Sequence, residues 1–299
     1  MTPRPPTDDD RTFTAERGRL LGLAYRILGS RTEAEDVVQD AWLRWQRADP
    51  ATIDRPAAWL TTVTSRLALD RLSSAQRRRE TYVGPWLPEP VVAGVGDAAD
   101  PADAIELQES LTLGFLTVLE RLAPVERVVF LLADVFAVPF DEIAETVDRS
   151  PAACRQVASR ARPRVRAGRP RFRPTDAEAW EATAAFFLAT SAGDVDGLLK
   201  VLSPDVVVMS DGGPDHHAAR RPVVGPHRVA RYLLNLAARR PQMEVEPAVV
   251  NGEPGCIIRT DGQIEMVLSV QVEDSLVVGL HVVVNPDKFG AVETRARFA

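Results

Sequence analysis

The most chemically distinctive stretch of this 299-residue chain is a run of arginines without an acidic neighbour. Residues 149–174, RSPAACRQVASRARPRVRAGRPRFRP, hold nine arginines and no Asp or Glu, whereas the whole chain carries 36 basic against 42 acidic residues. Guanidinium groups bind phosphates, and with paired hydrogen bonds they also bind guanine edges. The stretch therefore favours nucleic-acid binding, with an ordinary solvated basic face as the alternative.

Apolar spacing predicts that this run begins as a helix from Pro151 to about Arg166. Cys154, Val157, Ala161 and Val165 recur every three or four residues, which gives the helix one apolar face. Side chains on its other faces are the candidates for DNA contact: Arg155, Gln156, Ser159, Arg160 and Arg162.

A very short turn separates this helix from the one before it. Two helices are expected at Pro124–Val135 and Asp141–Val147, and Ser150 and Pro151 have the residue types of an N-cap and a first helical position. Two helices joined in this way form a helix-turn-helix, whose second helix enters the major groove of DNA.

The chain before residue 82 also has helical periodicity. One helix ends at Gly29–Ser30, a second covers residues 33–47, and a third opens at Pro56. The polar face of the second helix carries Asp36, Gln39, Asp40 and Arg44. The third helix is basic towards its end, with Arg66 and Arg71, and Trp59 fits its apolar stripe.

From residue 81 to residue 103 the periodicity disappears, and Pro, Gly, Ala and Asp dominate. This composition is typical of a linker between domains. Trp86 and Leu87 are large apolar residues in that linker, so we expect them to pack against another part of the protein.

Residues 175–299 have the pattern of an α+β domain. Helical segments at 178–192 and after Pro226 precede two alternating apolar stretches at 264–272 and 276–284, which predict a long hairpin. We expect helices first and a curved antiparallel sheet afterwards.

Composition excludes several classes of protein. With 45% hydrophobic and 26% charged residues, the chain reads as globular, with two or three domains. It shows neither a membrane-spanning apolar run nor a signal peptide, so we expect a cytoplasmic protein without membrane contact. Cys154 and Cys256 are far apart and lack CxxC partners, so we expect no disulfide, no metal site and no cofactor.

Two blocks of motifs resemble bacterial extracytoplasmic-function (group four) RNA polymerase sigma factors. AYRILGSRTEAEDVVQDAWLRWQRA and PAAWLTTVTSRLALDRLSSAQRRR are similar to domain two of this family. LAPVERVVFLLADVFAVPFDEIAETVDRSPAACRQVASRARPRVR is similar to its domain four. The resemblance implies domain two at residues 12–80, a linker at 81–103 and domain four at 104–172.

The resemblance also implies partners. The helix at 33–47 would bind the clamp helices of the polymerase beta-prime subunit, with the beta subunit as a further contact, although a solvated face explains the same charges. Arg66 and Arg71 would hold the separated strand of the minus-ten element of promoter DNA. The helix from Pro151 would read the minus-thirty-five element.

Three further motifs resemble the subgroup with a SnoaL-like extension, a nuclear transport factor 2-like cone that here would span residues 175–299. They are WLPEP at 86–90, SDGGPD at 210–215 and NPDKF at 285–289. Residues expected to connect the domains and regulate the protein are Trp86, Leu87, Pro88, Asp211, Asn285, Asp287 and Lys288. Asp215 departs from the subgroup, which usually has a lysine there.

Two functions remain open for the extension. It could be a built-in regulator that responds to a small-molecule or protein ligand. Residues 173–299 carry 12 basic and 17 acidic residues, so the extension is acidic and follows a basic helix-turn-helix. It could also be an active SnoaL-type isomerase or cyclase, with Asp211, His216, His217 and His281 as ionisable candidates. A pocket enclosed by the cone that contains two or more convergent ionisable side chains would favour the enzyme.

Overall fold

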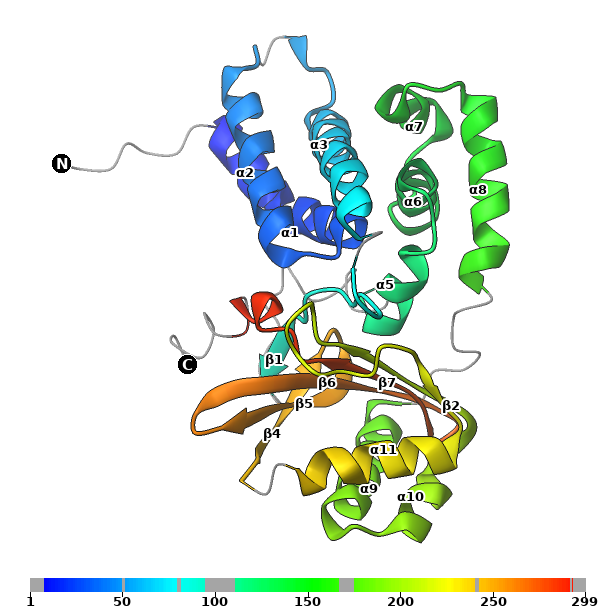
Figure 1. Cartoon of the computed structure of the whole chain (residues 1–299). Helices are drawn as coiled ribbons and strands as arrows, with labels where there is room; N and C mark the ends of the chain where they lie inside the picture. The colour runs from blue at the N-terminus through cyan, green and yellow to red at the C-terminus, as the bar shows by residue number, and fades with distance from the viewer. Residues whose placement is uncertain are drawn as a thin grey trace, which may run out of the picture. The chain divides into compact units, whose positions relative to one another are not determined.

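We describe a computed structural model of the chain (Figure 1), and the residues that it describes are 8–49, 52–79, 82–94, 111–166, 175–239, 242–290 and 292. The chain divides into two compact units. The first comprises residues 1–80, 99–110 and 118–167, and the second comprises residues 81–98, 111–117 and 168–299. None of the described helices is long and apolar enough to cross a membrane.

The first unit is helical. Its elements are α1 (Asp8–Leu28), α2 (Arg31–Arg47), α3 (Pro56–Arg79), α6 (Pro124–Phe130), the π-helical turn η3 (Leu131–Val135), α7 (Phe140–Val147) and α8 (Pro151–Arg166). The apolar residues that give the sequence of α1 and α2 its helical periodicity are buried, as Leu23 and Val37 illustrate. Trp59 of α3 packs against Trp45 of α2, with 5.6 Å between ring centroids. Trp59 therefore belongs to the packing of these helices, as its place on the apolar stripe predicted.

Helices α7 and α8 form the predicted helix-turn-helix. Asp148 has a left-handed backbone (φ +53°), which ends α7, and the Ser150 hydroxyl accepts a hydrogen bond from the Ala153 amide at 3.2 Å. Ser150 is thus the N-cap of α8, and Pro151 occupies the first helical position. A turn of three residues leaves α8 little freedom relative to α7.

The second unit combines helices with one mixed sheet. Its helices are α9 (Asp176–Ala192), α10 (Val195–Val201), α11 (Pro226–Ala238) and the short η4 (Pro286–Lys288), and α5 (Leu113–Leu119) contributes its first five residues. Its strands are β1 (Val92–Gly94), β2 (Leu202–Asp211), β3 (Val223–Val224), β4 (Glu244–Val250), β5 (Glu253–Thr260), β6 (Gln263–Glu273) and β7 (Leu276–Val283). The strand order is β1-β4-β5-β6-β7-β2-β3.

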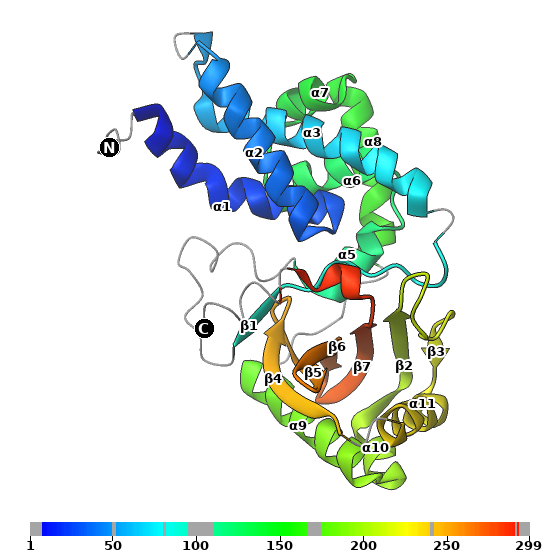
Figure 2. The ribbon, with the colours of Figure 1, turned by 60° about the vertical axis from the view of Figure 1, so that its left-hand side comes forward.

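The two faces of this sheet are covered differently. Helices α9, α10 and α11 gather on one face (Figure 2), where Phe186, Val229 and Leu268 belong to one apolar core. The other face carries a second cluster, which includes Leu87, Leu113 and Phe289. Residues from the predicted linker and from α5 therefore complete the second unit.

The sheet differs from the predicted order of helices followed by an antiparallel sheet. Strand β2 precedes α11 and pairs in parallel with β7, so the sheet is mixed. Strand β1 lies within the Pro- and Gly-rich stretch and pairs with β4, with Val92 opposite Val250. The hairpin of β6 and β7 is confirmed, and its turn at Asp274 and Ser275 has two residues with positive φ.

Candidate functional site

The exposed face of α8 presents most of the side chains that the sequence predicted for DNA. Cys154, Val157 and Ala161 are buried, whereas Arg155, Gln156, Ser159 and Arg160 are exposed on the opposite side. The Arg155 guanidinium lies 5.9 Å from the centroid of the Phe140 ring, which orients it near the start of the helix. The predicted residue Arg162 instead bonds Asp134 through Nε at 2.9 Å.

Arg66 of α3 makes contacts within the first unit. Its Nη2 donates to the Glu145 carbonyl at 2.6 Å, in the last turn of α7. A guanidinium at this end of a helix meets carbonyls without partners and the negative end of the helix dipole. A DNA strand bound by Arg66 would compete with the Glu145 carbonyl for this guanidinium.

The predicted polymerase face lies together on α2. Asp36, Gln39, Asp40 and Arg44 follow a spacing of three to four residues, on the side away from buried Val37 and Ala41. Arg71 of α3 donates to Asp36 at 3.1 Å and to Asp40 at 2.9 Å. The two carboxylates remain 59% and 46% exposed, so a partner can still reach them.

The second unit contains a buried ion pair built from the predicted regulatory residues. Lys288 Nζ lies 2.6 Å from Asp211 Oδ2, and the two side chains are 8% and 0% exposed. Lys288 also donates to the Leu87 carbonyl and sits 4.0 Å from the centroid of the Trp86 ring. The cation thus joins WLPEP to the NPDKF segment, and a compact ammonium suits such a dry space beside an aromatic face.

Asp211 uses both carboxylate oxygens. Besides Lys288, its Oδ2 accepts from the Leu87 amide at 2.7 Å, and its Oδ1 accepts from the Tyr82 hydroxyl at 2.5 Å and the Gly213 amide at 3.0 Å. These partners compensate for the cost of burying the charge. We call Tyr82, Trp86, Leu87, Asp211, Asn285 and Lys288 the linker cluster.

Sequence reasoning missed Tyr82 in this cluster. Its hydroxyl accepts a hydrogen bond from Asn285 Nδ2 at 3.1 Å, and burial followed by the bond to Asp211 raises the pKa of the phenol. Two other predicted residues flank the cluster in sequence. Pro88, which follows Leu87, is buried. The Asp287 side chain is exposed, and its backbone amide donates to the Asn285 side chain at 3.1 Å. Asp215 is exposed, so the position of the family lysine makes no buried contact here.

Two of the four ionisable candidates for an enzyme lie together: His216 and His217 line a small pocket of about 90 Å³, which contains neither Asp211 nor His281. Asp211 is paired with Lys288, and His216 and His217 are exposed in a loop. His281 faces away from Leu280 and Val282, as strand alternation predicted, but this side is not the helix-covered core. It approaches α5, because a Cβ on Gly114 would lie 3.4 Å from His281 Cε1. The His281 side chain therefore faces α5, on the side of the sheet opposite the helix-covered core.

Burial lowers the pKa of His281 to about 4. In the unfolded chain the imidazole regains an ordinary pKa, so the unfolded state binds more protons between about pH 6.5 and pH 4. We expect the free energy of unfolding of the second unit to fall by roughly 2 kcal/mol between pH 7 and pH 5 from this residue. Urea unfolding of wild type and His281→Gln at both pH values measures it, and an equal pH dependence in both proteins would contradict the assignment.

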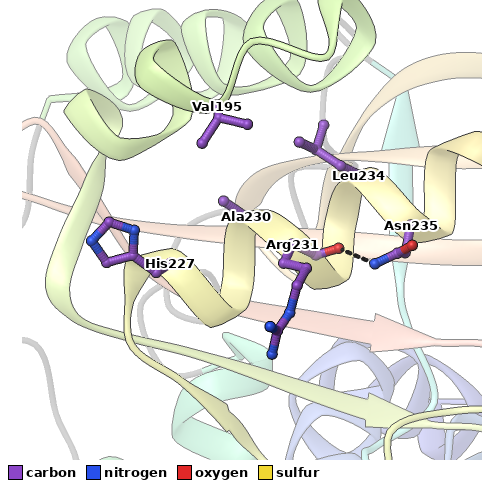
Figure 3. A pocket seen from close by; sticks show the side chains of 6 residues that line it. All are labelled: Val195, His227, Ala230, Arg231, Leu234 and Asn235. Carbon is purple, nitrogen blue, oxygen red and sulfur yellow. Dashed lines mark hydrogen bonds between the residues drawn. The ribbon is translucent and has the colours of Figure 1, made fainter.

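An open pocket of about 280 Å³ lies between the start of α10 and one side of α11 (Figure 3). Val195, Ala230 and Leu234 supply its apolar part, and His227, Arg231 and Asn235 supply polar groups. The Asn235 amide donates to the Arg231 carbonyl at 2.8 Å, within the same helix. This pocket contains none of the four enzyme candidates named from the sequence.

The described residues offer no cluster of three or more His, Cys, Asp and Glu side chains that could hold a metal. Cys154 and Cys256 are buried and unpaired, in different units. Burial raises the pKa of the Cys256 thiol to about 12, which keeps it protonated.

Comparisons with known proteins agree with this geometry. Sigma-70 region 2 matches residues 12–78, and Sigma-70, region 4 matches residues 113–165. The ECF RNA polymerase sigma factor SigJ of Mycobacterium tuberculosis is 43% identical over 96% of this chain and 95% of that protein. The probable ECF RNA polymerase sigma factor SigI of the same species is 37% identical over 92% of each chain.

A solved structure extends the similarity to the whole fold. The crystal structure of Mycobacterium tuberculosis extracytoplasmic function sigma factor SigJ matches with a TM-score of 0.76 and 41% identity, over 93% of this chain and 97% of that one. The match confirms the predicted fold class of helical sigma domains followed by an α+β domain. The chain belongs to the extracytoplasmic-function RNA polymerase sigma factors, and to those with a folded C-terminal extension.

Proposed function

We propose that this chain binds core RNA polymerase and directs promoter-specific transcription initiation as an alternative sigma factor. The observation that carries the proposal is the helix-turn-helix, whose α8 presents Arg155, Gln156 and Arg160 on one exposed face. Family membership and the acidic face of α2 support it further. The chain would act where the polymerase is, in the cytoplasm.

The division of labour follows the family blocks. Domain two (12–80) would bind the beta-prime clamp helices through α2 and hold the minus-ten element through α3, and domain four (104–172) would read the minus-thirty-five element, with the beta subunit nearby. Residues 81–103 would connect them. Residues 175–299 would act as a built-in regulator.

The linker cluster supports regulation by the C-terminal domain. Trp86 and Leu87 of the connecting segment are bound to Asp211 and Lys288, so the extension holds chain that lies between the two sigma domains in sequence. A ligand that prefers one arrangement of this segment would shift the protein towards that arrangement. A small molecule or a protein could be that ligand.

We propose that the extension is not an enzyme, because the pocket that His216 and His217 line is formed by an exposed loop and contains neither Asp211 nor His281. A general base and acid must both reach the reacting atoms. Among the described residues, Asp211, His216 and His281 lie in three different environments, and apolar side chains fill the core between the helices and the sheet.

Replacing Arg160 by alanine is expected to weaken promoter binding of the holoenzyme by roughly 1 to 3 kcal/mol, because a bidentate contact to a base is lost. Arg164→Ala is the matched control on the same helix, since Arg164 bonds Glu126 at 2.8 Å. Binding is measured on the promoter that wild type selects from a library randomised at both elements. Footprints that keep the minus-thirty-five contact in Arg160→Ala would refute the assignment of α8.

A further inference from the structure

The turn between β4 and β5 bonds one position in the linker, Val91, and one position near the start of domain four, Leu111. Asn251 and Gly252 form this turn, with φ values of +52° and +77°. Asn tolerates a left-handed backbone better than most residues, and an Asn-Gly pair is typical of a tight hairpin. Asn251 is only 3% exposed, however, so its side chain points into the protein.

The Asn251 side chain bonds two backbone positions that are far apart in the sequence. Its Oδ1 accepts from the Val91 amide at 2.9 Å, and its Nδ2 donates to the Leu111 carbonyl at 2.8 Å. The backbone amide of Asn251 adds a bond to the Val91 carbonyl at 2.8 Å. A carboxamide offers an acceptor and a donor side by side, so no carboxylate or hydroxyl can replace both bonds with the same geometry.

The residues that follow Val91 and Leu111 both pack on the sheet. Beyond Val91, strand β1 pairs with β4, and Gly94 lies opposite Ala248. Beyond Leu111, the side chain of Leu113 is fully buried in the cluster that contains Val250. Gly114 is packed so closely that a Cβ would lie 3.1 Å from Gln271 Oε1.

We propose that Asn251 is a positioning residue that fastens the linker at Val91 to the start of domain four at Leu111. An extended chain gains up to about 3.5 Å of reach with every residue. Once Val91 and Leu111 are bonded to one side chain, residues 92–110 no longer increase the distance that the chain can span between domains two and four. The C-terminal domain, and not the length of the linker, then limits the spacing of promoter elements that the protein accepts.

This inference rests on the proposed sigma function and predicts a separate observable. Asn251→Gly keeps the left-handed turn and removes both side-chain bonds, whereas Asn251→Asp keeps the acceptor for Val91 and removes the donor to Leu111. Asp261→Gly is the matched control, because Asp261 and Gly262 form an equivalent turn between β5 and β6, with φ values of +50° and +76°.

The experiment uses the full chain in two measurements. Hydrogen exchange of the Val91 amide should rise about tenfold in Asn251→Gly and stay near the wild-type rate in Asn251→Asp and Asp261→Gly. Transcription by holoenzyme is then compared on promoters whose two elements are one base pair closer or farther apart than in the wild-type optimum. The preference for the optimum should fall about threefold in both Asn251 variants and persist in Asp261→Gly.

The outcomes separate this inference from the function on which it rests. Unchanged exchange at Val91 in Asn251→Gly would overturn the fastening, and raised exchange with an unchanged spacing preference would overturn its consequence for promoters. In both cases wild type still initiates, so the sigma function stands. Failure of wild type to initiate at any spacing would instead overturn the proposed function and the spacing claim with it.

Discussion

Reversing the charge of Asp36 and Asp40 together, to lysine, is expected to abolish binding of this chain to core RNA polymerase. Both carboxylates lie on the exposed face of α2, in line with Gln39 and Arg44. If this face meets a basic surface of the clamp helices, two lysines place like charges opposite each other, which costs several kcal/mol and also slows association. A pull-down with immobilised core polymerase measures the loss.

The control for this variant comes from α3. Charge reversal also breaks the ion pairs of Arg71, so Arg71→Ala removes the same pairs without changing the acidic face. These pairs are exposed, and each contributes no more than about 1 kcal/mol. Arg71→Ala should therefore remain folded and bind polymerase. Retained binding by the charge-reversed protein would refute the polymerase face.

Replacing Lys288 by methionine is expected to destabilise the second unit by roughly 3 kcal/mol, because the Asp211 carboxylate stays buried without its cation. Adding Asp211→Asn removes the unpaired charge and should restore much of the loss. The chain offers a close control, since its only other lysine, Lys200, is exposed on α10. Lys200→Met should leave stability unchanged.

Two measurements on the Lys288 variant separate stability from regulation. Urea unfolding gives the loss of stability, and exchange of the Leu87 amide reports whether WLPEP is released from Asp211. At a temperature where the variant is still folded, release should lower transcription from the selected promoter while polymerase binding is retained. If Leu87 is released and transcription equals that of Lys200→Met, the linker cluster does not regulate initiation.

The local patterns of the chain predicted the helical elements well. The Ser150-Pro151 cap, the apolar stripe of α8 and the polar face of α2 depend on residues within a few turns, and the structure confirms them. Strand β2 was missed because its partner β7 lies about seventy residues later. Strand β1 was missed because three residues in a Pro- and Gly-rich stretch carry too little periodicity.

The contacts of single side chains were less predictable. The motifs indicated Trp86, Asp211 and Lys288 separately, and only the fold shows that they form one ion-paired cluster. Tyr82 and Asn251 carried no signal, because their partners lie more than a hundred residues away. The sequence predicted that Arg66 binds a DNA strand. Its hydrogen bond to the end of α7 depends on tertiary packing, which helical periodicity does not encode.

Run-off transcription with purified core polymerase and the full-length chain tests the sigma function most directly. On a template that carries the selected promoter, wild type should produce one transcript with a defined start, which core polymerase alone does not make. The variant with Asp36→Lys and Asp40→Lys should not produce it, and Arg160→Ala should produce less. Absence of a promoter-specific transcript with folded wild type on every selected template would contradict the sigma function.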